Sequence, residues 1–499
     1  MLLGIDVGTT GVKAAVFDEN GNMKGYGFRE YDVIYSAPGY AEQDAEAVFA
    51  HTKTAIREAV REIGHKIAAI SVSTQGDAVI PVDKNRSALS FAQLGMDYRG
   101  GKETEECKAL FDERELFQKT GMRPHPMNSL IKIMWMSKHD PGLAERTHRF
   151  VTYADFILAK LGSDDFVIDY TMASRTMAFD IHTKAWSQEI LQKLSLSARL
   201  FSTPVESGTV VGTIGKALST ELGIHEKTLL VAGGHDQPCA ALGAGIVKEN
   251  MALDSHGTAQ VLSACFETPQ TGETMFQSYY PCYFHVVKDM YFTFSLNHCG
   301  GILLQWYRDN LGLPEVTQAE KTGERAFEQI VKLAPKGPSP LLVLPHFNGS
   351  GTPTCDVNSK GAILGLTLSS TRHDIAKAIM ESLVFELRGN METMAKTGID
   401  IADLRCVGGG ARSPIDLQLK ADITGLPVAT LKTREAACLG AAIIAGYGAG
   451  VYGTIKEGAN LTKTDTIYEP NMQLHSQYDE KYYLFTKLYS TLKEINPML

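Results

Sequence analysis

The segment 3–13, whose sequence is LGIDVGTTGVK, constrains the fold of this chain more strongly than any other part. A short apolar strand ends near Asp6 and runs directly into a glycine turn that carries two threonines and a lysine. Burying an acid at the end of an apolar strand is unfavourable without a partner. Backbone N–H groups beside hydroxyls form a concave site for phosphate, and a carboxylate there can hold a hydrated Mg²⁺. The segment therefore favours nucleotide binding, and a strand followed by a plain hairpin turn is the alternative.

A second segment of the same kind lies halfway along the chain. Residues 252–259, ALDSHGTA, repeat the order of apolar residues, an acid and a Gly-Thr pair. One such turn in each half predicts a duplicated fold whose two lobes close on one phosphate chain. A lysine supplies a point charge for phosphoryl oxygens, and backbone N–H groups supply directional contacts. The residues expected to hold the triphosphate are Gly8, Thr9, Thr10 and Lys13 from the first turn, and Gly257 and Thr258 from the second.

The composition is that of an ordinary globular protein and excludes some classes of partner. The 499 residues are 44% hydrophobic and 21% charged, a length that predicts about two to four domains. The net charge of -9 argues against nucleic acid, whose phosphates attract basic surfaces. The eight cysteines are scattered and form no CxxC pair, which is typical of reduced thiols in a cytosolic protein.

No segment is expected to enter a membrane. Asp6 interrupts the apolar run at the N-terminus, and the apolar stretch 438–452 is punctuated by glycines and too short to span a bilayer. We therefore expect a cytoplasmic protein that has neither a membrane nor a nucleic acid as partner. Whether it forms a homodimer is left open.

The order of predicted elements indicates a two-lobed α/β protein. The N-terminal region is expected to contain three strands, a helix and a fourth strand, at 2–6, 12–18, 23–33, 45–63 and 67–73. This order is found in ribonuclease-H-like lobes. Further strands are predicted at 229–232, 251–265, 279–287, 290–296, 341–344 and 404–407, with helices from residue 301 onward. The boundary between the lobes is expected near 243–248, which gives an N-terminal lobe of residues 1–245 and a C-terminal lobe of residues 246–499.

Two longer motifs resemble the signatures of the FGGY carbohydrate kinases, the family that includes glycerol kinase and xylulokinase. Residues 127–139, MNSLIKIMWMSKH, fit the first signature. Residues 361–366, GAILGL, fit the second, together with Asp374, Ala378 and Glu381. The resemblance runs from residue 3 to about residue 446. It implies an α/β fold of two ribonuclease-H-like lobes, as in actin and hexokinase, with an inter-lobe cleft. It also implies ATP and Mg²⁺ as cofactors, with the sugar held by the N-terminal lobe and the nucleotide by the C-terminal lobe.

The segment Gly233–Gln237, GGHDQ, is the expected centre of the chemistry. A carboxylate just beyond a buried strand projects from the edge at which open α/β sheets bind ligands. An aspartate there can orient an acceptor hydroxyl and take its proton. The resemblance makes Asp236 the catalytic base and Gln237 a hydrogen-bond donor to the sugar, with Mg²⁺ near Asp6 and Asp236. The alternative is that Asp236 merely caps a helix that begins near Pro238.

Five further residues match family positions near the nucleotide. They are Gly301 and Gln305 in the segment GILLQW, and Gly409, Gly410 and Ser413 in the segment VGGGARS. The second segment is expected to turn from a strand into a helix, so that adenosine lies against bare backbone. A tight strand-to-helix connection without a ligand would need the same glycines.

Substrate recognition is expected from two short segments, Gln75-Gly76-Asp77 and Asp97-Tyr98-Arg99. Carboxylates and amides bind the neighbouring hydroxyls of a sugar or polyol well. Xylulose kinases of this family usually have Met-His where this chain has Gly76-Asp77, and Trp-Asn where Gly95-Met96 stand here. These departures predict a smaller and more acidic pocket, and they make a negatively charged sugar acid a less suitable substrate.

The expected activity is ATP-dependent phosphorylation of a hydroxyl of a small ketose, such as a pentulose, or of a polyol. Glycerol, erythritol or another sugar remains an alternative acceptor. An actin-like or heat-shock-type ATPase would share the phosphate turns, but it would lack the GGHDQ segment and a sugar pocket. A kinase-derived sugar sensor with weak catalysis is the third alternative, against which the intact acid, lysine and glycines argue.

Overall fold

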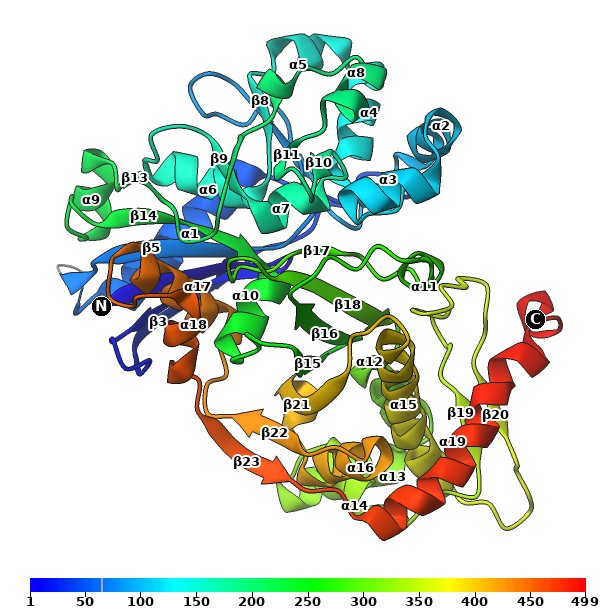
Figure 1. Ribbon diagram of the computed structural model, residues 1–499. Helices are drawn as coiled ribbons and strands as arrows, with labels where there is room; N and C mark the ends of the chain where they lie inside the picture. Colours follow the sequence, from blue (N-terminus) through cyan, green and yellow to red (C-terminus); the bar gives the residue numbers. More distant parts are fainter. Residues whose placement is uncertain (64–65) are drawn as a thin grey trace.

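Two mixed β-sheets, one from each half of the chain, form the frame of the molecule (Figure 1). The computed structural model describes residues 1–63 and 66–499. The first sheet has the strand order β13–β14–β5–β1–β2–β3, and the second has the order β17–β18–β16–β15–β21–β22–β23.

Most strands of the two sheets lie at predicted segments, but those at 210–213, 428–431 and 464–468 were not predicted from the sequence. In the first sheet the strands are β1 (Leu2–Val7), β2 (Gly11–Phe17), β3 (Met23–Glu30), β5 (Ala69–Thr74), β13 (Val210–Thr213) and β14 (Leu229–His235). In the second they are β15 (Asn250–His256), β16 (Gln260–Phe266), β17 (Tyr283–Phe284), β18 (Tyr291–Asn297), β21 (Ile401–Gly408), β22 (Val428–Leu431) and β23 (Thr464–Tyr468).

The two sheets share one topology, which confirms the predicted duplication. In the first, β1 pairs antiparallel with β2 and parallel with β5, and β5 pairs parallel with β14. In the second, β15 pairs antiparallel with β16 and parallel with β21, and β21 pairs parallel with β22. The strands β1 and β15 are therefore equivalent, and each of the two Gly-Thr turns follows the first strand of its sheet.

Several predicted elements differ in extent from the observed ones, and three of the differences are described here. The helix expected over 45–63 ends earlier, as α1 (Ala45–Val60), and the strand expected over 251–265 is divided by its Gly-Thr turn into β15 and β16. The strand expected over 279–287 is reduced to the two residues of β17, because only Tyr283 and Phe284 pair with β18. Tyr279 has a φ of 59°, which is incompatible with an extended strand.

The helices surround the two sheets (Figure 1). In the first half they are α2 (Gly101–Leu110), α3 (Glu113–Thr120), α4 (Ser129–His139), α5 (Pro141–Arg146), α6 (Tyr153–Leu161), α7 (Tyr170–Arg175), α8 (Gln188–Lys193), α9 (Lys216–Leu222) and α10 (Asp236–Gly243). In the second half they are α11 (Glu273–Gln277), α12 (Gly301–Asn310), α13 (Leu313–Thr322), α14 (Ala326–Leu333), α15 (Arg372–Ala395), α16 (Pro414–Thr424), α17 (Ala436–Gly448), α18 (Ile455–Gly458) and α19 (Met472–Leu492).

Among the described residues, ten short strands form two-stranded pairs outside the main sheets. They are β4 (Glu42–Gln43) with β7 (Ala92–Gln93), β6 (Ile80–Val82) with β8 (Arg149–Val151), β9 (Val167–Asp169) with β12 (Thr203–Val205), β10 (Phe179–Asp180) with β11 (Ala185–Trp186), and β19 (Leu342–Leu344) with β20 (Ala362–Leu364).

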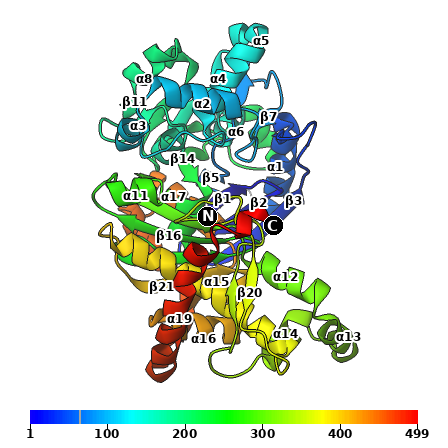
Figure 2. The same cartoon turned by 90° about the vertical axis from the view of Figure 1, so that its right-hand side faces the viewer.

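The C-terminal helix α19 packs on α15 and α16 at the far end of the second half (Figure 2). Tyr478, Tyr482 and Phe485 of α19 join a buried cluster with Phe385 of α15 and Leu419 of α16. Within residues 1–63 and 66–499, no helix combines the length and apolar character needed to span a bilayer.

Helix α17 comes from the second half of the chain but packs on the first sheet, where it crosses α10. The crossing is close enough to require glycine on both helices. A Cβ added to Gly440 would lie 1.9 Å from the backbone oxygen of Cys239, and one added to Gly243 would lie 1.8 Å from that of Ala436. The two halves are thus interleaved, and α10, which begins at Asp236, is held by backbone contact with α17.

We expect Gly440→Ala to destabilise the protein, because neither helix backbone can move away from the added methyl group without disturbing the first sheet. The free energy of unfolding should fall by about 1–3 kcal/mol, as for other overpacked sites. Chemical denaturation measures this change.

Gly389→Ala, in the middle of α15, is the matched control. Its added Cβ would meet only the Tyr482 hydroxyl, at 3.5 Å, so it should be neutral or stabilising by up to about 1 kcal/mol. Equal effects of the two substitutions would contradict a close crossing.

Candidate functional site

The first Gly-Thr turn connects β1 to β2 and is held by backbone and side-chain hydrogen bonds. The Gly8 N–H donates to the Gly11 carbonyl at 3.0 Å, and the exposed Thr10 accepts from the Tyr31 N–H through its carbonyl. The Thr9 hydroxyl donates to Gln75 Oε1 at 3.2 Å. Gln75 therefore helps to fix the conformation of the turn.

The two strand-end acids predicted from the repeat differ in their partners. Asp254 of β15 forms a buried ion pair with Lys420; burial alone would raise the Asp254 pKa, but the Lys420 charge lowers it overall. Asp6 of β1 accepts a hydrogen bond from Ser73 Oγ at 2.9 Å and forms no ion pair with any described residue. Burial raises the Asp6 pKa. Of the two equivalent acids, Asp6 is the one left for a cation.

Lys13 follows the first turn on β2, where Glu435 holds it. Its ammonium lies 2.8 Å from Glu435, the N-cap residue of α17. Burial lowers the Lys13 pKa, but the hydrogen bond and charge of Glu435 raise it overall. The lysine is therefore charged and restrained.

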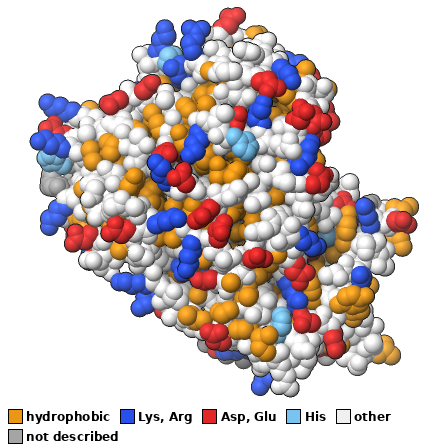
Figure 3. All heavy atoms as spheres, viewed as in Figure 1, with side chains coloured by type: hydrophobic (Ala, Val, Ile, Leu, Met, Phe, Trp, Pro, Cys, Tyr) orange, Lys and Arg blue, Asp and Glu red, His pale blue; other side chains and the backbone are white. Residues whose placement is uncertain are grey.

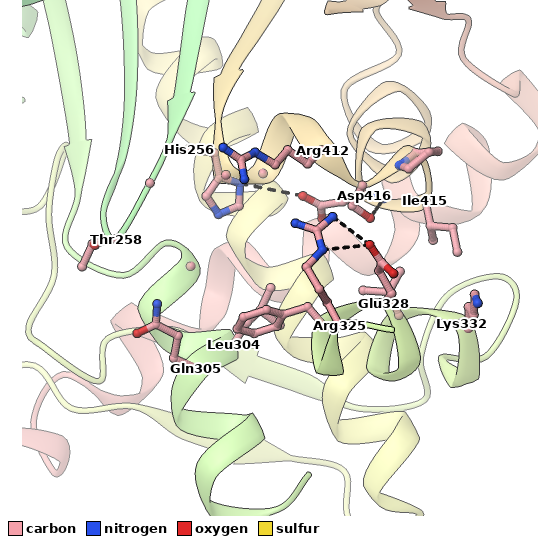
Figure 4. Close-up of a pocket in the computed structure, with 18 residues that line it drawn as sticks. His256, Thr258, Leu304, Gln305, Arg325, Glu328, Lys332, Arg412, Ile415 and Asp416 are labelled. Atoms are coloured by element: carbon pink, nitrogen blue, oxygen red, sulfur yellow. Dashed lines mark hydrogen bonds and ion pairs between the residues drawn. The ribbon is translucent and has the colours of Figure 1, made fainter. Parts of the chain in front are cut away.

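A cavity of about 540 Å³ in the second half brings together all seven nucleotide residues predicted there (Figure 4). They are Gly257, Thr258, Gly301, Gln305, Gly409, Gly410 and Ser413. The turn at 257–259 is bound to the start of α12, because the Gly301 N–H donates to the Gly257 carbonyl at 2.8 Å. Ser413 caps α16 by accepting from the Asp416 N–H. A side chain on Gly410 would lie 2.4 Å from His256 Nδ1, so the bare backbone is needed for this approach.

The opposite side of this cavity contains residues that the sequence did not single out. Arg325, at the start of α14, lies 2.7 Å from Glu328, and Figure 4 shows this pair across from Thr258 and Gln305. Phe327 and Val331 of the same region add apolar surface. For this segment the sequence predicted only that helices follow residue 301, and it singled out no residue as part of a site.

A second cavity, of about 360 Å³, lies between the two sheets and contains Asp236. Five other predicted residues line it, namely Thr9, Gln75, Gly76, Asp77 and Gln237, and the second half contributes Val261, Phe294 and Leu296. The acid and the first phosphate turn therefore share one cleft.

Asp236 is the first residue of α10, immediately after β14. The N-cap is His235 and its side chain makes no capping bond, so the alternative in which Asp236 caps a helix from Pro238 is wrong. Burial in the cleft, and next the charge of Asp6, raise the pKa of Asp236 to about 7. The two carboxylates are therefore neighbours in one electrostatic environment.

The sugar side of the cleft holds a buried ion pair that the sequence did not predict. Arg175 of α7 lies 2.6 Å from Asp77 Oδ2, and both side chains are buried. The guanidinium neutralises Asp77, which corrects the expectation of a pocket made more acidic by this residue. Among the described residues, Asp77 Oδ1, Arg175 Nε and Gln237 Oε1 have no hydrogen-bond partner. Buried polar atoms are rarely left unpaired, so these three favour a polar ligand.

The structure does not bring Asp97 and Arg99 to this cleft, although both were expected to bind substrate. Asp97 is fully buried; it accepts from the Ala41 N–H at 2.8 Å and from Arg99. Arg99 also pairs with Glu42 and stacks on Tyr40, 3.6 Å from the ring centroid. Their charges and hydrogen bonds are satisfied within the protein, so they support the chain behind the pocket.

On the face in Figure 3, acidic and basic side chains are interspersed and do not gather into one basic area.

All eight cysteines are free, and seven of them are buried.

Comparison with known proteins gives consistent matches along the whole chain. The model described as "FGGY family of carbohydrate kinases, N-terminal domain" matches residues 1–243, and the corresponding C-terminal domain matches residues 254–449. A xylulose kinase of Staphylococcus epidermidis is 28% identical over 99% of this chain and 97% of its own. A glycerol kinase of Lactobacillus acidophilus is 30% identical over 94% of each chain. The crystal structure of a ligand-bound xylulose kinase from Lactobacillus acidophilus superposes with a TM-score of 0.90 at 24% identity, covering 99% of this chain and 98% of the other.

We expect Arg175→Met to be strongly destabilising, because it leaves the Asp77 carboxylate buried without a counter-charge. Breaking a buried pair from one side costs about 3–5 kcal/mol of unfolding free energy. The double variant Asp77→Leu/Arg175→Met should recover most of that loss. Urea denaturation of both variants provides the measurement.

Arg388→Met serves as the control, since the acids it pairs with, Glu392 and Asp479, are about half exposed. Its effect should stay below about 1 kcal/mol. A similar loss for Arg388→Met and Arg175→Met would show that the Asp77 pair has no special role in the fold.

Proposed function

Because the chain belongs to the FGGY family of carbohydrate kinases, and so transfers phosphate from ATP to a sugar or polyol, we propose that Asp236 is the general base of this transfer. The observation that carries the proposal is that Asp236 and Thr9 line one cleft between the sheets. Membership of the family also sets aside the alternative of an assembly or chaperone ATPase. The lobe boundary at 245/246 and the cytoplasmic location remain predictions, and whether the chain forms a homodimer stays open.

The position and pKa of Asp236 suit a base that acts on an alcohol. A base works best when its pKa lies near the operating pH, and that of Asp236 is raised to about 7. Its place at the end of β14 directs it toward the ligand edge of the sheet. In this proposal, Asp236 accepts the proton of the acceptor hydroxyl while that oxygen attacks the terminal phosphorus of ATP and ADP leaves in line.

We assign the nucleotide to the cavity of about 540 Å³, with its phosphates directed to the two turns. The N–H groups and hydroxyls of Gly8, Thr9, Thr10, Gly257 and Thr258 would bind the phosphate oxygens. Lys13 would stabilise the charge that develops on the transferred group, since Glu435 holds it in position.

Asp6 and Asp236 fit a Mg²⁺ ion held mostly by phosphate and water. The negative charge of Asp6 makes ionisation of Asp236 less favourable, and no described Lys or Arg forms an ion pair with either acid. Mg²⁺ is commonly bound by one or two carboxylates together with substrate phosphates. When bound, the ion neutralises charge on the phosphates.

We propose a small neutral ketose or polyol as the acceptor. Asp77 Oδ1 and Gln237 Oε1 are free to accept from hydroxyls, and Arg175 Nε is free to donate. The cleft is lined by the carboxylates of Asp77 and Asp236 and by the guanidinium of Arg175, and the charge of Asp6 acts on Asp236, so a sugar acid would meet net negative charge. A volume of about 360 Å³ suits a small ligand.

A panel of pentuloses, hexoses, glycerol, erythritol and gluconate, assayed for ADP release with Mg-ATP, tests the activity. We expect acceptor-dependent turnover with a neutral member, and Asp236→Asn should lower kcat by about 10²–10⁴-fold through loss of the base. Asp289→Asn, an exposed acid that pairs with Lys184, is the control and should leave kcat unchanged. Equal turnover by Asp236→Asn and the wild type would remove Asp236 from the reaction.

Removal of the metal tests the role given to Asp6. Turnover should stop in EDTA and return when Mg²⁺ is added back. Asp6→Asn should need at least about tenfold more Mg²⁺ for half-maximal turnover at saturating ATP, because one of two carboxylates is lost. An unchanged Mg²⁺ requirement in this variant, with Asp289→Asn also unchanged, would place the ion elsewhere.

A further inference from the structure

A buried histidine in the wall of the nucleotide cavity has no role in the activity described above. His256 is the last residue of β15, directly before Gly257 and Thr258, and it lines the cavity of about 540 Å³. Its side chain is only 3% exposed. Its Nε2 is buried and has no hydrogen-bond partner among the described residues. Because buried polar atoms are rarely left unpaired, this nitrogen indicates a contact with a ligand.

Behind the ring of His256 lies an ion pair that is completely buried. Asp254 and His256 are two residues apart on β15, so their side chains lie on the same face of the strand. On that face, the ammonium of Lys420 from α16 contacts Asp254 and lies 3.2 Å from His256 Nδ1. Gln260 Nε2 donates to the other oxygen of Asp254 at 3.0 Å. A buried ion pair adds little stability, because the lost solvation offsets the attraction, so we look for its role in what it does to His256.

The contact with Lys420 fixes which nitrogen of His256 carries the proton. An ammonium group has three donors and no acceptor, so Nδ1 must accept the hydrogen bond. Burial lowers the pKa of Lys420, but the charge of Asp254 raises it overall, so the group is charged. The Asp416 carboxylate lies 3.8 Å from Nδ1, which is too far for a hydrogen bond (Figure 4). The proton is therefore on Nε2, the nitrogen that has no partner.

The Nε2–H group is suited to an anionic oxygen. Hydrogen bonds in a chain polarise one another, so a cation that donates to Nδ1 makes Nε2–H a stronger donor. Such a donor gains most from a charged acceptor. The chain itself places the ring next to the turn of Gly257 and Thr258, to which we assign phosphate. The acceptor that fits this position is therefore a phosphate oxygen of the nucleotide.

We propose that His256 is a nucleotide-binding residue: its Nε2–H donates to a phosphate oxygen of ATP or ADP, and the Asp254–Lys420 pair positions the ring and fixes its tautomer. His256 lines the nucleotide cavity and not the cleft that contains Asp236, so its acceptor belongs to a phosphate that is not transferred. No proton moves to or from His256. The contact therefore contributes to nucleotide affinity and not to the chemical step. This inference rests on the proposed assignment of the nucleotide to this cavity.

Calorimetric titration of the full-length protein with ADP and with adenosine tests the proposal. We expect His256→Phe to weaken ADP binding by about 10–100-fold, because a hydrogen bond to a charged group is lost while the ring is kept. Adenosine affinity should stay within about twofold. In the assay with Mg-ATP, the KM for ATP should rise by a similar factor, whereas kcat should change by less than about threefold. His225→Phe, at an exposed histidine before β14, is the matched control and should leave all four quantities unchanged.

Two further variants test the ion pair and the cavity separately. Asp254→Leu/Lys420→Met removes the pair without leaving a buried charge unpaired, and it should also weaken ADP binding. Adding His256→Phe to this double variant should cause little further loss, because both changes act on one hydrogen bond. Gly409→Val takes up part of the cavity and should weaken ADP and adenosine alike.

The outcomes distinguish this inference from the assignment on which it rests. An ADP affinity of His256→Phe within twofold of the wild type, while Gly409→Val is impaired, would overturn the role of His256 alone. Equal losses of ADP and adenosine affinity in His256→Phe would also overturn it, because phosphate would not be the acceptor. ADP binding that Gly409→Val leaves unchanged would overturn the assignment of the nucleotide to this cavity.

A measurement on the wild-type protein covers the case in which a variant does not fold. The ¹⁵N spectrum of protein labelled at histidine should show His256 as the Nε2–H tautomer, and ADP should shift its Nε2 signal more than adenosine does. A proton on Nδ1, or a signal that ADP does not shift, would overturn the proposal.

Discussion

Two carboxylates at strand ends of one sheet, Asp6 near the end of β1 and Asp236 just after β14, impose the constraint on which the rest of the site depends. Burial, and next the charge of Asp6, raise the pKa of Asp236 to about 7, and no described Lys or Arg forms an ion pair with either acid. Such an arrangement is unfavourable in an empty cleft and becomes favourable when a cation and phosphates arrive. The equivalent acid of the second sheet, Asp254, is paired with Lys420, so in our proposal only the first sheet supplies carboxylates to the cation.

The interleaving of the halves keeps these groups in register. Helix α17 from the second half lies on the first sheet, crosses α10 at Gly440 and Gly243, and holds Lys13 through Glu435 at its N-terminus. The same helix thus supports the start of α10, where Asp236 stands, and the lysine after the phosphate turn. A movement of the second half relative to the first would therefore affect the positions of Asp236 and Lys13 together.

Local sequence predicted the parts of the site that depend on local structure. In the segments 3–13 and 252–259, an apolar strand followed by a glycine turn is visible in the sequence itself. The apolar strand before GGHDQ likewise predicts that Asp236 lies at the end of a strand. Contacts between side chains that are far apart in the sequence could not be predicted from local sequence patterns. Arg175 reaches Asp77 from a separate helix, and Tyr283 reaches His235 from the other sheet. Asp97 and Arg99 had the residue types of a sugar site, but their mutual ion pair and the ring of Tyr40 hold them inside the protein.

The central claim, that both turns and Asp236 converge on one phosphate chain, is tested most directly by a crystal structure with Mg²⁺, a non-hydrolysable ATP analogue and the best acceptor. The account predicts the phosphates between Thr9 and Thr258, with an acceptor oxygen about 3 Å from Asp236 and in line with the terminal phosphorus. A phosphate chain bound away from either turn, or an acceptor beyond the reach of Asp236, would contradict it.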